Sequence, residues 1–356
     1  MTGRREFVKQ LTAAGIACSF PSVLFAGQKT ASAMIWADLI HLSYNFWGEN
    51  VLHPKYGDKY FKCTTCAQAR EWAHSYRPEL TFDEPVWNML LDQMASVGMN
   101  LVVIDLGDGV RYESHPEIAV KNAWTVKKLK SELDRVRELG LEPIPKLNFS
   151  TAHDLWLGKY SRMVSTDIYY HVCRDLIDEV IDIFGKPRFF HLGMDEENAH
   201  DQSQFNYTVI RQNDLWWNDF YFFVDQVEKR GVQAWIWSDY AWHHPDLFFK
   251  KMPKSVIQSN WYYGSSFDPD TLKEPYKTSI QLYNKLEEYG YEQIPTGSNH
   301  SSPDNFGRTV EYCKKVVDPS RLIGFMTASW RPTLQECLNT HREAIGQVEN
   351  AIKNYQ

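Results

Sequence analysis

Short β-branched or aromatic runs alternate along the chain with longer amphipathic stretches, and this alternation limits the possible folds more than any other feature. Eight runs are expected to form strands, at residues 35–44, 100–106, 142–149, 188–194, 232–239, 255–262, 291–297 and 321–330. Helical patterns such as 125–140 and 167–185 lie between them and often end at a glycine. Eight strands alternating with helices predict a (β/α)₈ TIM barrel. An open doubly wound sheet is the alternative, although no glycine-rich phosphate loop follows the first run.

The first 33 residues differ in character from the rest of the chain. Arg4-Arg5 precedes a weakly apolar run, and Ala31-Ser32-Ala33 fits a cleavage site, so residues 1–33 are expected to form a twin-arginine export signal. The protein would then be periplasmic or extracellular, with membrane association through the signal segment as an alternative. We expect residues 34–356 to form one barrel, with a long loop insertion at about 45–98 that caps one face.

Composition limits the kinds of partner that this protein is expected to bind. The net charge of −7 argues against a nucleic-acid partner or an anionic membrane surface. No stretch after the signal reaches the length of apolar residues that a stable membrane span needs. Cys63 and Cys66 have the spacing of a local disulfide or of two loop thiols, and no second pair follows to complete a zinc site. The oligomeric state stays open.

The fourth predicted strand runs straight into three acidic residues, in FFHLGMDEENAH (189–200). Active sites of TIM barrels form at the carboxyl ends of the strands, which places Asp195 and Glu196 at the mouth of the barrel. A neighbouring charge and partial burial raise the pKa of one carboxyl, so Glu196 is expected to stay protonated beside an ionised Asp195. Glu197 is interpreted as solvated or as a charge at a helix N-terminus.

Polar and aromatic residues also gather at the ends of the other predicted strands. Aromatic rings stack on sugar faces, and carboxylates and amides bind hydroxyls, so this rim predicts a carbohydrate substrate. The residues expected to bind it are Asp105, Asn148, His153, His191, Trp237, Asp239, Trp261, Tyr262 and Trp330.

The segment HLGMDEE resembles the H-x-G-G-D-E signature of family 20 glycoside hydrolases, the β-N-acetylhexosaminidases. LGLEPIPKLNFSTAH is similar to that family's P-E-I-D-M-P-G-H segment, and the weaker likeness extends over most of residues 95–332. The resemblance implies substrate-assisted catalysis, in which the 2-acetamido group of the substrate attacks the anomeric carbon. Glu196 would then be the general acid and base, and Asp195 would orient the acetamido nitrogen. No metal and no organic cofactor are expected.

The chain departs from this family at several positions. Met194 replaces the second glycine of the signature, and Lys146 and Asn148 replace two acids. The first strand lacks the family's arginine and the seventh lacks its tyrosine, for which Tyr262 or Tyr263 are candidate substitutes.

Three other functions therefore stay open. One is a carbohydrate-binding barrel with altered or lost catalysis. Another is a metal-dependent barrel hydrolase that uses histidines near the strand ends with Asp105 or Asp195. The third is a retaining glycosidase with a protein nucleophile, for which Asp239 or Asp105 are the candidates.

Overall fold

The computed structural model describes residues 34–49, 73–203 and 205–355. The predicted export signal (1–33) and the Cys63–Cys66 pair lie outside the described residues. Among the described residues, no helix is both long enough and apolar enough to cross a bilayer.

Eight parallel strands form the predicted (β/α)₈ barrel. They are β1 (Ile35–His41), β2 (Leu101–Asp105), β5 (Glu142–Lys146), β6 (Phe189–His191), β7 (Gln233–Trp237), β8 (Ile257–Ser259), β9 (Thr296–Gly297) and β10 (Gly324–Thr327). The hydrogen-bonded order is β8-β7-β6-β5-β2-β1-β10-β9, and single bridges at Gln258–Gln293 and Trp261–Thr296 join the two edges. Each of the eight strands falls within one of the runs expected from the sequence.

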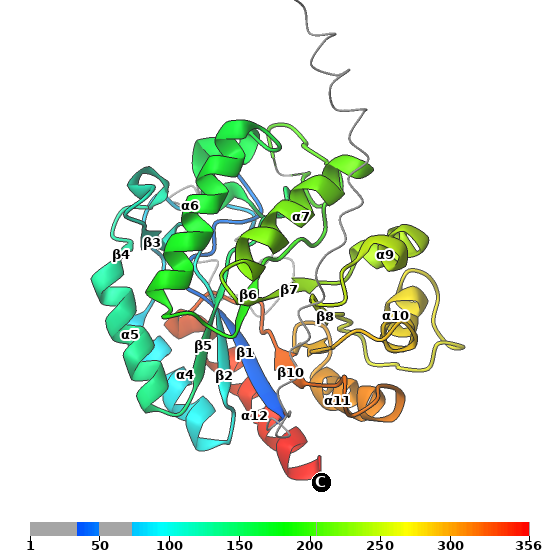
Figure 1. Ribbon diagram of the computed structural model, residues 1–356. Helices are drawn as coiled ribbons and strands as arrows, with labels where there is room; N and C mark the ends of the chain where they lie inside the picture. The colour runs from blue at the N-terminus through cyan, green and yellow to red at the C-terminus, as the bar shows by residue number, and fades with distance from the viewer. Residues whose placement is uncertain (1–33, 50–72, 204, 356) are drawn as a thin grey trace, which may run out of the picture. The chain divides into compact units, whose positions relative to one another are not determined.

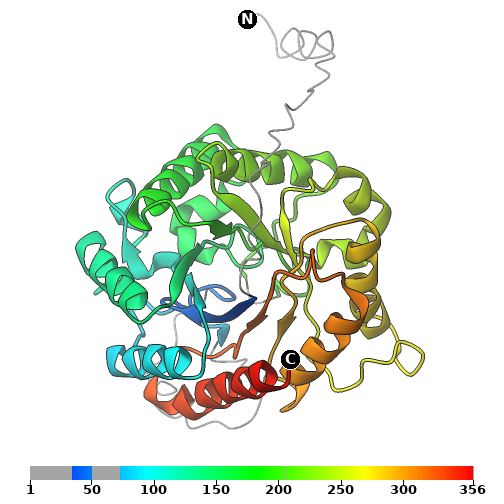
Figure 2. The same cartoon turned by 60° about the horizontal axis from the view of Figure 1, so that its bottom comes forward.

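Helices surround the strands as a ring (Figure 2). They are α4 (Glu84–Ser96), α5 (Val126–Glu138), α6 (Asp167–Ile183), α7 (Asp214–Glu228), α8 (Tyr240–His243), α9 (Pro245–Lys251), α10 (Tyr276–Glu288), α11 (Asn305–Val316) and α12 (Leu338–Asn354). A short pair, β3 (Val110–Arg111) with β4 (Trp124–Thr125), and a 3₁₀ segment at Leu155–Arg162 lie in the connections (Figure 1).

Local sequence explains where these helices begin and end. The Thr166 hydroxyl caps α6 by accepting a hydrogen bond from the backbone N–H of Tyr169 at 3.3 Å. Gly185 follows the same helix with φ +67°, a conformation that side chains other than glycine rarely adopt. Within the predicted insertion at 45–98, α4 is a member of the outer ring and packs against α12.

The core has two layers because successive strand residues point to opposite faces. Along β1, Ile35, Ala37 and Leu39 face the barrel interior, whereas Trp36 and Ile40 pack against the helices. The same alternation separates inward-facing from outward-facing side chains along the other strands.

Candidate active site

The loop after β6 turns sharply where the acidic residues begin. Gly193, Met194 and Glu196 all have positive φ, at +73°, +75° and +55°. A Cβ atom on Gly193 would lie 2.0 Å from Oδ1 of Asn148, so only glycine fits there. These turns interrupt the alternation of the strand and allow Asp195 and Glu196 to share one pocket.

Asp195 is held ionised by its neighbours. Its Oδ1 accepts a hydrogen bond from Asn148 Nδ2 at 2.8 Å and lies 3.1 Å from His153 Nδ1. The residue is 6% exposed. Burial by itself would raise the pKa of Asp195, but the charge and hydrogen bond of His153, together with Lys146 and Asn148, hold it well below its usual range.

Glu196 has the opposite electrostatic character. Burial raises the pKa of Glu196, the contact with His153 opposes this, and the charge of Asp195 raises it further, with a net rise. His153 Nε2 lies 3.3 Å from Glu196 Oε2, so the imidazole bridges the two carboxyl groups. Burial lowers the pKa of His153, but the two carboxyl groups outweigh this and raise it to about 10. A carboxyl group with a raised pKa therefore stands beside one with a lowered pKa, the asymmetry that a general acid with an electrostatic partner requires.

Asp239 joins this pair from the end of β7. Its Oδ2 accepts a hydrogen bond from the backbone N–H of Glu196 at 2.8 Å, and Trp261 Nε1 lies 3.4 Å from its Oδ1. Burial and the charge of Asp195 raise the pKa of Asp239 to about 8. The structure thus brings together six of the predicted residues through direct polar contacts: Asn148, His153, Asp195, Glu196, Asp239 and Trp261.

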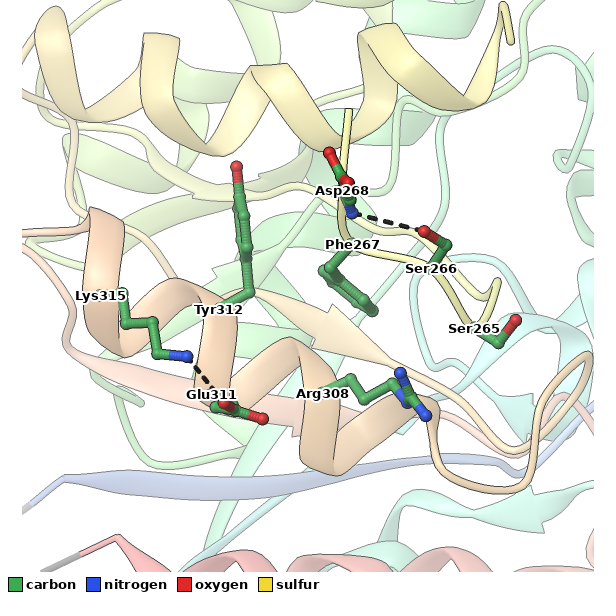
Figure 3. Close-up of a pocket in the computed structure, with 8 residues that line it drawn as sticks. All are labelled: Ser265, Ser266, Phe267, Asp268, Arg308, Glu311, Tyr312 and Lys315. Atoms are coloured by element: carbon green, nitrogen blue, oxygen red, sulfur yellow. Dashed lines mark hydrogen bonds and ion pairs between the residues drawn. The ribbon is translucent and has the colours of Figure 1, made fainter. Parts of the chain in front are cut away.

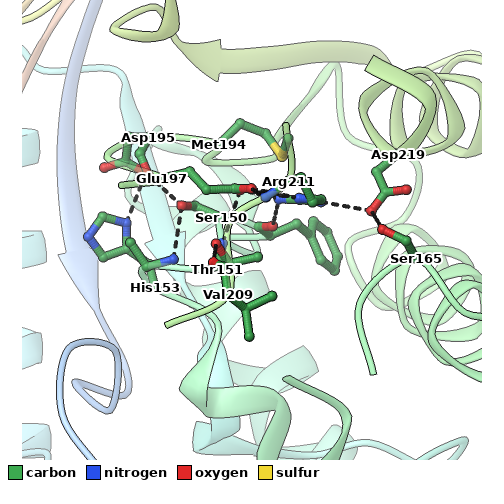
Figure 4. A network of polar contacts seen from close by, with 12 residues as sticks. Ser150, Thr151, His153, Ser165, Met194, Asp195, Glu197, Val209, Arg211 and Asp219 are labelled. Carbon is green, nitrogen blue, oxygen red and sulfur yellow. Dashed lines mark hydrogen bonds and ion pairs between the residues drawn. The ribbon is translucent and has the colours of Figure 1, made fainter. Parts of the chain in front are cut away.

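Glu197 is not solvated, contrary to the sequence-based interpretation. Its side chain is 4% exposed, and it accepts hydrogen bonds from Arg211 Nη2 at 2.6 Å and from Arg211 Nε at 3.0 Å. Arg211 Nη1 also contacts Asp219 of α7 at 3.1 Å (Figure 4). Glu197 therefore anchors the loop after β6 to α7 through a buried cation, a contact that sequence spacing gave no reason to expect.

A row of buried polar side chains forms the floor of the barrel mouth. His41, Asp105, Lys146 and His191 are consecutive partners across β1, β2, β5 and β6. Lys146 forms an ion pair with Asp105, and His41 Nδ1 lies 3.4 Å from Asp105 Oδ2. His191 Nδ1 accepts a hydrogen bond from the backbone N–H of Gly193 at 3.1 Å. Asp105 and His191 thus lie inside the barrel, each at most 1% exposed, rather than on the rim.

Several polar atoms of this floor have no hydrogen-bond partner among the described residues. They are Asp105 Oδ1, His41 Nε2, His191 Nε2 and Trp237 Nε1. Buried polar atoms require partners, and here these would be ordered water or the polar groups of a ligand.

Aromatic rings form the wall above this floor. Trp330 lies at the centre, with ring centroids 5.7 Å from His41, 5.9 Å from Trp237 and 6.4 Å from Tyr263. Trp47 lies 5.5 Å from His153 and 6.5 Å from Trp330. Trp237 is buried, whereas Trp47 and Trp330 are half-buried and keep part of their surface toward solvent.

Tyr262 was predicted to bind substrate, but its ring packs in the outer layer of the core. It is 5% exposed and packs outward against Phe267 and Tyr276, at 5.2 and 6.1 Å. Its neighbours Trp261 and Tyr263 point inward and stack on each other at 5.1 Å, as alternation along the strand requires. Burial and the charges of Glu196 and Asp195 raise the pKa of the Tyr263 hydroxyl.

Trp47 was not among the residues expected to bind substrate, and Tyr263 was named only beside Tyr262 as a substitute for the family's tyrosine. Alternation along the strand could have separated Tyr263 from Tyr262, because Trp261 and Tyr263 are two residues apart and share a face. Trp47 lies beyond β1 in a loop, where no periodicity applies. That loop is held by Asn45, which exchanges hydrogen bonds of 2.8 and 2.9 Å with the backbone of Arg77.

His153, Asp195 and Glu196 also form a group that could hold a metal ion, with ligand atoms within 4.8 Å of one another. A histidine ligates a metal through a neutral ring nitrogen. Here both ring nitrogens of His153 face carboxyl oxygens, and the raised pKa keeps the ring protonated. The His153 ring is thus ion-paired with both carboxyl groups.

A separate hollow of about 520 Å³ lies on the outside of the barrel, between the loop after β8 and helix α11 (Figure 3). Its charged side chains pair locally, Lys315 with Glu311 at 2.7 Å and Arg308 with Asp304 at 2.6 Å. It contains none of the residues of the candidate active site.

Neither a known family model nor a curated protein sequence matches this chain. Solved structures do match its fold. The chitobiase of Flavobacterium johnsoniae is 14% identical, with a TM-score of 0.52, and the match covers 76% of this chain and 48% of that protein. The N-acetyl-β-hexosaminidase of Streptomyces plicatus in complex with Thio-NAglucal is 12% identical, with a TM-score of 0.54 and coverages of 89% and 64%. Dispersin B is 15% identical, with a TM-score of 0.50 and coverages of 78% and 96%.

This chain therefore spans about half of the chitobiase and less than two thirds of the Streptomyces enzyme. At such identities, the likeness shows a shared fold: this chain is a (β/α)₈ barrel similar to the barrels of family 20 β-N-acetylhexosaminidases.

Proposed function

We propose that the protein is a glycoside hydrolase that cleaves a glycosidic bond of an N-acetylated amino sugar by substrate-assisted, retaining catalysis. One observation carries the proposal. His153 bridges Asp195 and Glu196 at the mouth of the barrel, and the two carboxyl groups have pKa values displaced in opposite directions. The neighbours in fold, whose names describe hexosaminidases and a chitobiase, support the same chemistry.

In this mechanism, Glu196 donates its proton to the leaving oxygen as the bond from that oxygen to the anomeric carbon breaks. The acetamido carbonyl oxygen forms the new bond to that carbon, which gives a cyclic oxazolinium. Asp195 stays ionised, accepts the acetamido N–H and stabilises the positive charge that develops. Water then opens the ring with Glu196 as the base, so the product retains its configuration.

The remaining residues of the pocket have supporting roles. We assign to Tyr263 the hydrogen bond to the acetamido oxygen, the role that the resemblance gives to a tyrosine on a different strand. Trp47, Trp261 and Trp330 are half-buried and offer apolar faces for the sugar and its acetamido methyl group.

The test compares a chromogenic β-N-acetylglucosaminide with the matching β-glucoside, using wild type, Glu196→Gln and Asp195→Asn. We expect wild type to cleave only the acetamido sugar and both variants to lose about a hundredfold or more in kcat. Glu311→Gln, on the exposed face of α11, is the control and should match wild type. A trifluoroacetamido substrate should react more slowly than the acetamido one, because fluorine withdraws electrons and makes the carbonyl oxygen a poorer nucleophile.

Other outcomes would redirect the proposal. Equal cleavage of both sugars would rule out participation of the acetamido group. Cleavage of neither, with binding of N-acetylglucosamine still detected by calorimetry, would identify a carbohydrate-binding barrel. Activity lost on chelation and restored by zinc would favour a metal-dependent hydrolase.

A further inference from the structure

Asp239 is buried at the mouth of the barrel, and the proposed mechanism gives it no role. It lies just after β7, and its carboxyl group is directed toward the loop that follows the neighbouring strand β6. It is 5% exposed. Asp195, Glu196 and Tyr263 are the titratable groups that face it. A carboxyl group placed so close to two others requires an explanation, because like charges at this distance oppose ionisation.

The contact of Asp239 with the catalytic loop is made to the backbone. Its Oδ2 accepts the N–H of Glu196 at 2.8 Å, while Trp261 Nε1 faces its Oδ1 at 3.4 Å. Glu196 itself has φ +55°, a conformation that costs energy for a residue with a side chain. A buried acceptor at this N–H stabilises the turn and so fixes the direction in which the Glu196 side chain leaves the backbone.

We infer that Asp239 is the positioning residue of the acid Glu196: through the Glu196 N–H it holds the left-handed turn that directs the acid toward the leaving oxygen. The inference rests on the proposed function for the identity of the acid. In this role Asp239 does not contact the substrate or attack the anomeric carbon, whereas in the alternative function Asp239 is the nucleophile.

The protonation of Asp239 agrees with this role. Burial and the charge of Asp195 raise its pKa to about 8, so Asp239 is mostly neutral at pH 7. A nucleophile would need to be ionised, whereas an acceptor of a backbone hydrogen bond needs only a carbonyl oxygen. Asparagine has that oxygen and is neutral, so it reproduces the neutral carboxyl group that the structure favours.

The experiment compares Asp239→Asn with Asp239→Ala on the acetamido substrate. Asp239→Ala should lower kcat about a hundredfold with KM within about twofold, because the acid is misdirected while the sugar pocket is intact. Asp239→Asn should recover most of this loss and stay within about tenfold of wild type. Asp246→Ala, in the exposed first turn of α9, is the matched control. Circular dichroism and thermal unfolding establish that each variant folds.

Two results would overturn the inference. If Asp239→Asn is as inactive as Asp239→Ala, and azide restores the activity of the alanine variant as a glycosyl azide, Asp239 is a nucleophile. If Asp239→Ala retains the kcat of wild type, the backbone contact has no catalytic role.

Failure of the proposed function would appear differently, as a wild type that cleaves no acetamido sugar. In that case, crystal structures of the two variants decide the matter. The positive φ of Glu196 should persist with asparagine and be lost with alanine, and its persistence in both would refute the inference.

Discussion

The imidazole of His153 is the link on which the candidate active site depends, and His153→Gln tests it. Glutamine is similar in length but neutral, so the buried positive charge between Asp195 and Glu196 disappears. In wild type that charge lowers the pKa of both carboxyl groups. In the variant both pKa values should rise, by about 1 to 3 pH units for a charge at this distance.

The contribution of His153 to the free energy of unfolding follows from its pKa, which rises from 6.5 to about 10 on folding. This difference corresponds to about 5 kcal/mol at 1.36 kcal/mol per pH unit. Because the folded pKa is the higher one, this stabilisation is fully present below pH 6.5 and is lost as the pH rises through about 10. Removing one partner of a buried ion pair costs about 3–5 kcal/mol, so the variant should be less stable by about that amount at pH 6.

Two measurements check this prediction. Urea unfolding of wild type and His153→Gln between pH 6 and 9.5 should show a stability difference that narrows as the pH rises. The acidic limb of the kcat/KM profile should move upward by about 1 pH unit or more, since Asp195 then protonates more readily. His171→Gln, exposed on α6, is the control. A stability difference that is constant with pH, together with superimposable rate profiles, would refute the bridging imidazolium.

Four further substitutions probe the surroundings of the site. Gly193→Ala should destabilise the protein by at least about 2 kcal/mol in urea unfolding, because it combines a positive φ with a clash against Asn148. An alanine variant as stable as wild type would contradict the close approach. Arg211→Met should cost about 3–5 kcal/mol, because it leaves buried carboxylates without their cation; a loss below about 1 kcal/mol would show that the network is solvated. Tyr263→Phe should lower kcat about tenfold or more on the acetamido substrate, whereas Tyr262→Phe should leave it unchanged, and equal effects would contradict the inward orientation of Tyr263.

Much of the fold could be predicted because its signals are local. Strand and helix periodicities, and glycines after helices, act over a few residues, and they located all eight strands. The position of Asp195 and Glu196 at the end of β6 followed from the same reasoning. Predicting contacts was harder where the chain leaves regular structure. Glu197 follows Asp195 and Glu196 directly in sequence, yet the turn of the loop directs it to Arg211.

The sequence by itself determined the barrel and the edge at which carboxylates, amides and aromatic rings collect, since alternation fixes which face each strand residue occupies. Only the tertiary structure decided which of these groups meet. His153 reaches Asp195 from a different loop, Asp239 reaches the Glu196 backbone across a strand gap, and Lys146 neutralises Asp105 below them. The reason is physical: closing the barrel sets the distances between strands, while positive backbone φ angles beyond the strand ends redirect side chains in ways that periodicity does not encode.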